Sequence, residues 1–435
     1  MDASAIVDRL TTPQTRVDPY PLYEQAHALG PVVRVDDTFV LVTGHAAADR
    51  VLRERGFGVL DRQASAAMFG GESEAPSQEL FGRSILQSNP PVHTRLRGPI
   101  AAVFTPRRIA ALEPAIARAV DRLLAGMAES GRAGAPVDFM DRFAFPLPVG
   151  VICELLGVPE EDRYRFRDPA HDLMGVLEFM SVATDTGPAD RAALELGGYF
   201  ADLVAERRAR PQDDLIGALV RLRDEDPEQA IGDAELVANL VLLLVAGFET
   251  TTNLLGNGLA LLGEHPDVRR ALVDRTLPVA DFVEEVLRYD SPVQLTSRVA
   301  LRDDLSIDGV PVPRFAEVLV LIGAANRDPA RYRDPQRFDP WRAEGGSLSF
   351  GAGLHFCVGA MLARLEATVA FPRLLDRFPA LTLAPGATRR DRLVLRGYGE
   401  LPVTVDAVGA AGTMGATGAG GAVGDRVGPD ESGGS

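Results

Sequence analysis

The chain of 435 residues lacks lysine altogether, so all 45 of its basic residues are arginine. Because 61 acidic residues outnumber them, the formal net charge is −16 and the isoelectric point lies near 4.9. A surface of this sign repels phosphate backbones and anionic lipid headgroups, which excludes nucleic acid and membrane surfaces as bulk partners. An acidic protein partner would have to dock on a local patch of arginines.

Cysteine is nearly absent as well, since Cys153 and Cys357 are the only two. Two cysteines so far apart do not make the disulfide framework of a small secreted domain, and they favour a reducing, cytoplasmic compartment. The N-terminus has neither a basic nor an apolar segment, so we expect no secretory signal. The most apolar run, residues 240–248, ends at Glu249 and is too short to span a bilayer. The sequence therefore predicts a cytoplasmic protein with no membrane span.

The spacing of apolar residues predicts a mainly helical chain with a smaller β-rich part. Alternation predicts a β-hairpin at 32–43, and weak periodicity predicts a long irregular loop at 60–90. Helical periodicity predicts helices at 105–131, 160–180, 188–210, 233–262, 279–289 and 357–377. Strands are expected at 296–301, 305–307 and 316–322, near 381 and at 401–405. Because strands and helices are segregated rather than alternating, the fold class is α+β.

The composition changes at the C-terminal end of the chain. Residues 408–435 are mostly glycine and alanine, with too few bulky side chains to form a core. We therefore expect residues 1–407 to form a single domain and 408–435 to be a disordered tail.

A cysteine ends a glycine-rich stretch at the start of a predicted helix. The stretch is Phe350-Gly351-Ala352-Gly353-Leu354-His355-Phe356-Cys357-Val358-Gly359. Backbone N–H groups and a helix N-terminus can share the charge of a thiolate, and glycines allow that close approach. A zinc site is disfavoured because no CxxC or HExxH accompanies His355 and Cys357. Cys153, in an apolar setting, is interpreted as a buried small hydrophobe.

The predicted buried helix carries a charged and hydroxylated motif in its middle, where such groups are costly. The motif is Ala246-Gly247-Phe248-Glu249-Thr250-Thr251. Thr250 can bond back to the carbonyl of Ala246 and open the helix beside Gly247. On the alternative interpretation this is an ordinary helix, with Glu249 reaching solvent and the threonines bonded back.

Together these two motifs resemble those of the cytochrome P450 family, and the resemblance covers roughly residues 15–406. It implies one mainly helical domain with a small β-rich lobe, and haem b bound to the thiolate of Cys357 as iron ligand. Phe350, Gly351, Gly359 and Ala246 would contact that haem. Glu249 and Thr250 would deliver protons while dioxygen is activated, since both are replaced in the peroxide-using members.

Weaker motifs match the same family. Glu285 and Arg288, at i and i+3 on one helical face, resemble its structural pair, which Arg337 before Phe338 would complete. Cationic partners are needed by the two haem propionates, and four positions match them: His93, Arg97, Arg298 and His355. Asn89 departs from the family's usual aspartate, which leaves the local helix cap in doubt.

The resemblance also implies partners and a pocket. Substrate-pocket candidates, for which plain core packing is the alternative, are Leu242, Leu243, Ala246, Gly247, residues 293–296 (Val293, Gln294 and Leu295 above all), the 60–90 loop, residues 173–180 and Tyr398. The chain has no flavin or dinucleotide domain, so a ferredoxin and its reductase would supply electrons. Arg107, Arg108 and Arg364 are candidates for a basic docking patch. We expect a monomer.

The implied reaction is hydroxylation or epoxidation of a hydrophobic small molecule with dioxygen, first of all a polyketide or macrolide in natural-product biosynthesis. A peptide, a terpenoid or a carrier-bound amino acid is the alternative substrate. A non-enzymatic haem-thiolate sensor or gas carrier is the competing class, and it predicts no need for Glu249 and Thr250.

Overall fold

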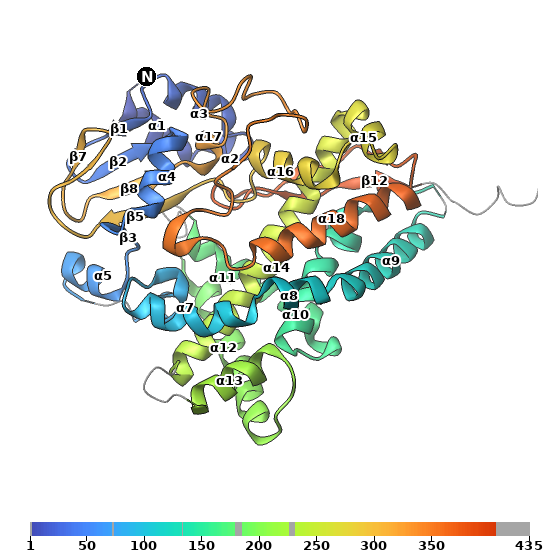
Figure 1. Ribbon diagram of the computed structural model, residues 1–435, viewed down its shortest axis with the longest axis horizontal. Coiled ribbons are helices and arrows are strands. Elements are labelled where there is room, and N and C mark those ends of the chain that lie inside the picture. Colours follow the sequence, from blue (N-terminus) through green and yellow to red (C-terminus); the bar gives the residue numbers. More distant parts are fainter. Residues whose placement is uncertain (1, 72–73, 133, 179–184, 226–230, 406–435) are drawn as a thin grey trace, which may run out of the picture.

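The computed structural model describes residues 2–71, 74–132, 134–178, 185–225 and 231–405. Blue N-terminal and orange segments build a β-rich lobe at one side of the molecule, and helices make up the rest (Figure 1). The predicted tail, residues 408–435, lies outside the described residues. The α+β class predicted from the sequence is confirmed by this architecture.

Helices account for most of the described chain. The longer ones, of eleven residues or more, are α7 (Val92–Val103), α9 (Glu113–Ser130), α10 (Pro146–Leu156), α12 (Gly187–Ala209), α13 (Leu215–Glu225), α14 (Asp233–Glu264), α16 (Val279–Tyr289) and α18 (Ala360–Arg377). The shorter ones are α1 (Ala3–Leu10), α2 (Pro13–Val17), α3 (Tyr20–His27), α4 (His45–Arg53), α5 (Arg62–Phe69), α6 (Pro76–Gly82), α8 (Pro106–Ala111), α11 (Arg167–Met174), α15 (Pro266–Val273) and α17 (Ile322–Ala325). Short 3-10 or π-helical segments are η1 (Ile85–Gln87), η2 (Met140–Ala144), η3 (Glu160–Phe166), η4 (Gly175–Leu177) and η5 (Gly353–His355).

Short strands form four sheets among the described residues. They are β1 (Val32–Arg34), β2 (Phe39–Val42), β3 (Phe57–Gly58), β4 (Val137–Asp138), β5 (Thr296–Ala300), β6 (Leu305–Ile307), β7 (Val310–Val312), β8 (Glu317–Val320), β9 (Thr382–Leu383), β10 (Thr388–Arg389), β11 (Tyr398–Glu400) and β12 (Pro402–Thr404). The largest sheet has the order β1-β2-β8-β5-β3, in which only β2 and β8 run parallel. Smaller sheets pair β4-β12-β9, β10-β11 and β6-β7.

Helix α14 forms the centre of the helical part, where α18 packs beside it (Figure 1). It starts where the carboxylate of Glu235 accepts a hydrogen bond from the backbone N–H of Gly232, 2.9 Å away. Its 32 residues are long and apolar enough to cross a membrane, yet most of them are buried inside the protein. At Gly258 an added Cβ would lie 2.4 Å from the ring of Phe371, so glycine lets α18 approach this closely.

One prediction of local structure is wrong. Residues 60–90 are not an irregular loop, because α5, α6 and η1 lie within them. Asp61 accepts a hydrogen bond from the Ala64 N–H and caps α5, while α6 begins with a proline in its first turn. The side chain of Asn89 also serves this region, since it bonds both to the backbone of Val59 and to Asp61.

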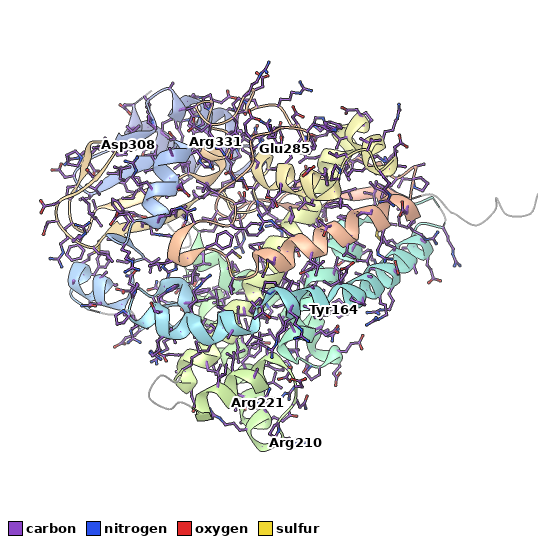
Figure 2. The ribbon with its side chains drawn as sticks, viewed as in Figure 1. Tyr164, Arg210, Arg221, Glu285, Asp308 and Arg331 are labelled. Atoms are coloured by element: carbon purple, nitrogen blue, oxygen red, sulfur yellow. The ribbon has the colours of Figure 1, made fainter. Side chains whose placement is uncertain are left out.

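A buried cluster of charges fixes α16 against residues 326–342. Both carboxylate oxygens of Glu285 accept hydrogen bonds from Arg288, at 2.7 and 2.8 Å. The prediction that Arg337 completes this pair is wrong, because Arg342 does so, 2.9 Å from the carboxylate. The side chain of Arg337 points to solvent and only its carbonyl joins the cluster, accepting from Arg288. The label of Glu285 in Figure 2 marks where this cluster lies, beside α16.

Candidate active site

The cysteine loop has the tight geometry that its glycines predict. Gly351 and Gly353 adopt positive φ angles of 68° and 66°, which disfavour any residue with a side chain. A Cβ on Gly353 would also lie 2.3 Å from the carbonyl oxygen of Leu52. The N–H of Cys357 donates to the carbonyl of Phe350 at 2.9 Å, which closes the loop just before α18.

The thiol of Cys357 keeps an exposed face at the start of α18. Burial by the surrounding loop raises its pKa, while hydrogen bonds from the backbone N–H of Gly359 and Ala360 and the guanidinium of Arg97 act in the opposite direction. These donors suit a thiolate, and a bound metal ion would supply the remaining positive charge. Cys153 is wholly buried in α10, and burial raises its pKa to about 12.

Four cationic or protonatable side chains gather around this loop. The rings of His93 and His355 lie 4.4 Å apart, and Arg97 donates to the carbonyl of Phe356 at 2.6 Å. Arg298 is buried and, within the part of the chain that the structure describes, bonds only to Thr296 and Ser297; burial lowers its pKa to about 10.

Among the described residues, no acidic side chain pairs with these four groups. Burial lowers the pKa of His93 to about 4 and that of His355 to about 3. Within the described ranges, none of the four residues has a carboxylate partner, and the Nε2 atom of buried His93 has no hydrogen-bond partner. A ligand that carries two carboxylates satisfies such a set, so the site fits haem and its propionates.

The motif of α14 confirms one local prediction and corrects another. Thr250 Oγ1 donates to the carbonyl of Ala246 at 3.0 Å, as predicted, and Thr251 Oγ1 donates to that of Gly247. Glu249 does not reach solvent, because its side chain is buried and forms an ion pair with Arg390. Arg390 lies 141 residues further along the chain. No spacing in the sequence could have indicated this partner.

The predicted pocket residues divide into two groups. Leu242 and Ala246 lie at i and i+4 on the same face of α14 as Thr250. Gly247 faces α10 instead, since its Cβ would lie 2.8 Å from Ile152 Cγ1, so it serves helix packing. Leu243 is buried in the core cluster, as is Leu295.

The other candidates lie at the end of α16 and near the C-terminus. Val293 forms an isolated bridge with Leu395. Gln294 is fully buried and donates to Tyr20 and Ser291, so it is held by α3 rather than facing a pocket. Residues 173–178 are described and 179–180 are not.

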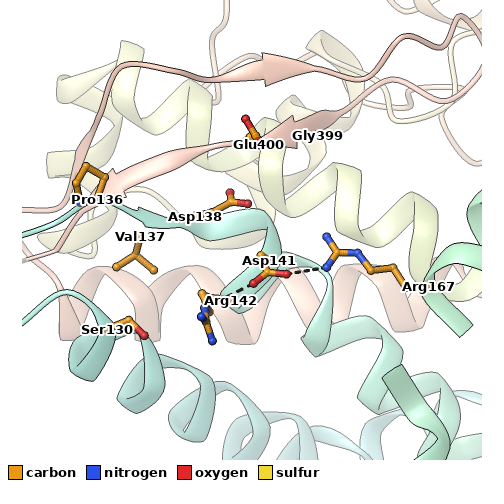
Figure 3. Close-up of a pocket in the computed structure, with 9 residues that line it drawn as sticks. All are labelled: Ser130, Pro136, Val137, Asp138, Asp141, Arg142, Arg167, Gly399 and Glu400. Carbon is orange, nitrogen blue, oxygen red and sulfur yellow. Dashed lines mark hydrogen bonds and ion pairs between the residues drawn. The ribbon is translucent and has the colours of Figure 1, made fainter. Parts of the chain in front are cut away.

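Tyr398 lies next to Arg389, and its place in the substrate pocket stays a prediction. It lines a cavity of about 420 Å³ with Asp290 and Arg389, whose guanidinium lies 3.8 Å from the centre of the tyrosine ring. Another cavity, of about 390 Å³, is lined by charged residues from η2, α11 and β11 (Figure 3). Neither cavity includes Cys357 or Thr250, so neither belongs to the site around the cysteine loop.

Comparison with known proteins identifies the family. The profile described as cytochrome P450 matches residues 190–392. The 6-deoxyerythronolide B hydroxylase of Saccharopolyspora erythraea is 40% identical over 418 residues, which cover 92% of this chain and 99% of the relative. This chain is a member of the cytochrome P450 family.

Other members support the same assignment. The vitamin D(3) 25-hydroxylase of Pseudonocardia autotrophica is 43% identical over 323 residues, 73% of this chain and 76% of the relative. The ligand-free structure of CYP164A2 from Mycobacterium smegmatis has a TM-score of 0.82 at 38% identity and covers 93% of this chain and 100% of that one. The enzyme is therefore a monooxygenase whose cofactor is a haem with a cysteine thiolate ligand, and it uses oxygen and a redox partner on small substrates. This excludes the non-enzymatic sensor as the main function.

Proposed function

We propose that this cytochrome P450 hydroxylates or epoxidises a hydrophobic small molecule in natural-product biosynthesis, with Cys357 as the iron ligand. The four side chains near the loop that lack a carboxylate partner carry the proposal. Arg298 and Arg97 bind the two haem propionates, and His93 and His355 donate further hydrogen bonds. Phe350, Gly351 and Gly359 let the loop approach the cofactor, and Ala246 contacts it from α14.

Haem supplies the chemistry of dioxygen activation when it is bound. The chain would contribute the thiolate of Cys357 as iron ligand, whose charge would push electron density toward the bound metal. Thr250 holds its hydroxyl against the Ala246 carbonyl within the unbroken helix α14, so the hydroxyl has a fixed position. Glu249 delivers protons to that hydroxyl from a buried position, where its side chain pairs with Arg390.

A macrolide or other polyketide is the first candidate substrate. The support is the 6-deoxyerythronolide B hydroxylase, which aligns with 92% of this chain. A terpenoid-like substrate is the second candidate, because another relative of similar identity is named for hydroxylation of vitamin D(3). Leu242 and Ala246 on the inner face of α14, with Val293, are the side chains that would contact either.

The proposal also covers the redox partners, the oligomeric state and the location in the cell. We propose a monomer in the cytoplasm that receives electrons from a ferredoxin and its reductase. Arg107 and Arg108 are exposed on α8 and suit the acidic face of a ferredoxin. Arg364 is less available than predicted, because it pairs with Glu284 and lies over the ring of Phe350. Residues 1–407 would form the haem domain and 408–435 a disordered tail.

The haem assignment is tested by the spectrum of the reduced protein with carbon monoxide. Thiolate ligation by Cys357 gives a red-shifted Soret band that Cys357→Ala loses and Cys153→Ala keeps. A red-shifted Soret band that persists in Cys357→Ala would overturn the ligand assignment. Substrate class is tested by adding macrolactones and steroid-like compounds and recording the spin-state shift. A shift with the second group alone would move the proposal to terpenoids.

The role of the α14 motif is tested by Thr250→Ala. We expect the variant to consume oxygen but to release it as hydrogen peroxide instead of oxidising substrate. Thr251→Ala is the matched control, since its hydroxyl bonds the neighbouring carbonyl of Gly247. Unchanged coupling in Thr250→Ala would remove the proton-delivery role.

A further inference from the structure

The ion pair between Glu249 and Arg390 joins two distant parts of the chain inside the protein. Glu249 lies in the middle of α14, and Arg390 directly follows β10. Both side chains are shielded from solvent, and Nε of Arg390 also donates to the carbonyl of Tyr398 at 3.2 Å. That carbonyl belongs to β11, so the guanidinium of Arg390 is bonded to β11 as well as to Glu249. The carboxylate is therefore bound to a fixed cation rather than to a free surface arginine.

The residues that follow Arg390 bind the end of the α11 region. Arg392 donates to the carbonyl of His171 at 2.6 Å. The N–H groups of Leu393 and Val394 both donate to one carboxylate oxygen of Glu178, at 2.9 and 3.0 Å. Four of the five residues in 390–394 thus contact either the acid of the α14 motif or the ends of the 171–178 segment, and Asp391 pairs with Arg16 instead. Helix α11 also packs directly against α14, so the two regions are neighbours.

Charges around Glu249 come from both of these elements. Arg390 and Arg392 lie on the C-terminal side, while His171, Asp172 and Glu178 lie on the α11 side. Arg392 is half-buried, and its Nη1 has no hydrogen-bond partner within the described part of the chain. Because Arg392 bonds to the carbonyl of His171, a displacement of the 171–178 segment would shift Arg392 and, through the backbone between them, Arg390.

We propose that Arg390 is a positioning residue for Glu249 and that residues 390–394 couple it to the 171–178 segment. While Arg392 and Glu178 hold that segment, Arg390 keeps the carboxylate of Glu249 bound and turned toward β10. Loosening the segment releases the carboxylate to act with Thr250. This inference rests on the proposed role of Glu249 in proton delivery.

The first experiment measures how oxygen is used by the haem-loaded, full-length protein. A plant-type ferredoxin and its reductase supply electrons, and the fraction of consumed oxygen released as hydrogen peroxide is recorded, which requires no known substrate. We expect Arg390→Gln to change this fraction by about twofold or more, and Arg390→Lys to restore it. In a Glu249→Gln background, Arg390→Gln should add nothing. An unchanged fraction, or an equal change in both backgrounds, would overturn the positioning role.

The second experiment follows hydrogen–deuterium exchange of the same proteins. We expect Arg392→Gln to raise exchange in residues 167–178 by about threefold or more and to alter the peroxide fraction in the same direction as Arg390→Gln. Arg373→Gln is the control, because Arg373 pairs with Asp121 on the protein surface. Faster exchange with an unaltered peroxide fraction would overturn the coupling.

The proposed proton delivery by Glu249 and the proposed positioning role of Arg390 can be tested separately. If Glu249→Gln leaves the peroxide fraction unchanged, the proposed proton delivery is wrong. If Glu249→Gln changes it and Arg390→Gln does not, only the positioning role is wrong.

Discussion

Two groups of buried charges in this protein are built on opposite principles. At Glu285, the carboxylate accepts four hydrogen bonds, two from Arg288, one from Arg342 and one from the N–H of Asp339. Around the cysteine loop, Arg298 is equally buried, but its only partners among the described residues are a hydroxyl and a carbonyl. A saturated cluster stabilises the fold, whereas a cluster that lacks its counter-charge is prepared for a ligand.

The largest expected effect lies in the saturated cluster. Glu285→Ala leaves the buried guanidinium of Arg288 uncompensated, which costs about 3–5 kcal/mol of unfolding free energy. Urea unfolding and the yield of soluble protein measure this loss. Arg337→Ala is the control, because the side chain of Arg337 is exposed. If both variants unfold at the same urea concentration, the scaffold role of this cluster is wrong.

The second effect lies in the unsaturated cluster. Arg298→Ala should weaken haem binding by about 10- to 100-fold, the value of one charge-assisted hydrogen bond. Stability of the haem-free protein should change by less than about 1 kcal/mol, because no buried carboxylate loses its partner. Haem titration and urea unfolding of the same samples separate the two quantities. A loss of stability as large as that in Glu285→Ala would erase the distinction between the clusters.

A third test uses pH, on a carboxylate of the saturated kind. Asp290 is fully buried, which by itself raises its pKa, but the guanidinium groups of Arg389 and Arg396 outweigh burial and hold it well below its usual range. A depressed pKa stabilises the fold at every pH above the unfolded value, near 4, and the stabilisation is lost as pH falls through the folded value. We expect Asp290→Asn to remove on the order of 2 kcal/mol from the acid dependence of unfolding. If the unfolding free energy of the natural protein and of Asp290→Asn falls equally as the pH is lowered, this expectation is wrong.

The smallest effect is expected at the exposed arginines of α8. Arg107→Ala and Arg108→Ala should each lower the rate of reduction by a ferredoxin about two- to threefold at low salt and less at high salt. Stopped-flow reduction at two ionic strengths measures the change. Arg132→Ala, another exposed arginine, is the control. Equal rates in all variants would move the docking surface away from α8.

The sequence indicated those parts that depend on neighbouring residues. The 279–289 helix, the 32–43 hairpin and the back-bonded Thr250 were predicted from periodicity and side-chain chemistry, and the structure confirms them. The sequence could not indicate which distant side chains contact one another, because tertiary packing decides this. Arg342 rather than Arg337 reaches Glu285, and Arg390 meets Glu249, because backbone turns far from either residue decide which side chain points inward.

The helices within 60–90 show a second reason why the sequence alone did not predict part of the fold. Their side chains are small and weakly periodic, so intrinsic preference gives little signal. Caps and contacts with distant residues decide the structure instead, as where Ser77 bonds to Asp190 of α12. The sequence did not indicate that Tyr398 packs against Arg389, and its place in the substrate pocket stays a prediction.

The burial of Cys153 has a practical consequence. With its pKa raised to about 12 and no exposed surface, this thiol reacts very slowly with alkylating reagents. The haem-free protein therefore offers one thiol for labelling, at Cys357, and haem ligation would block it. Counting labelled molecules by mass spectrometry then gives the fraction of the preparation that carries cofactor, without reference to any absorption coefficient.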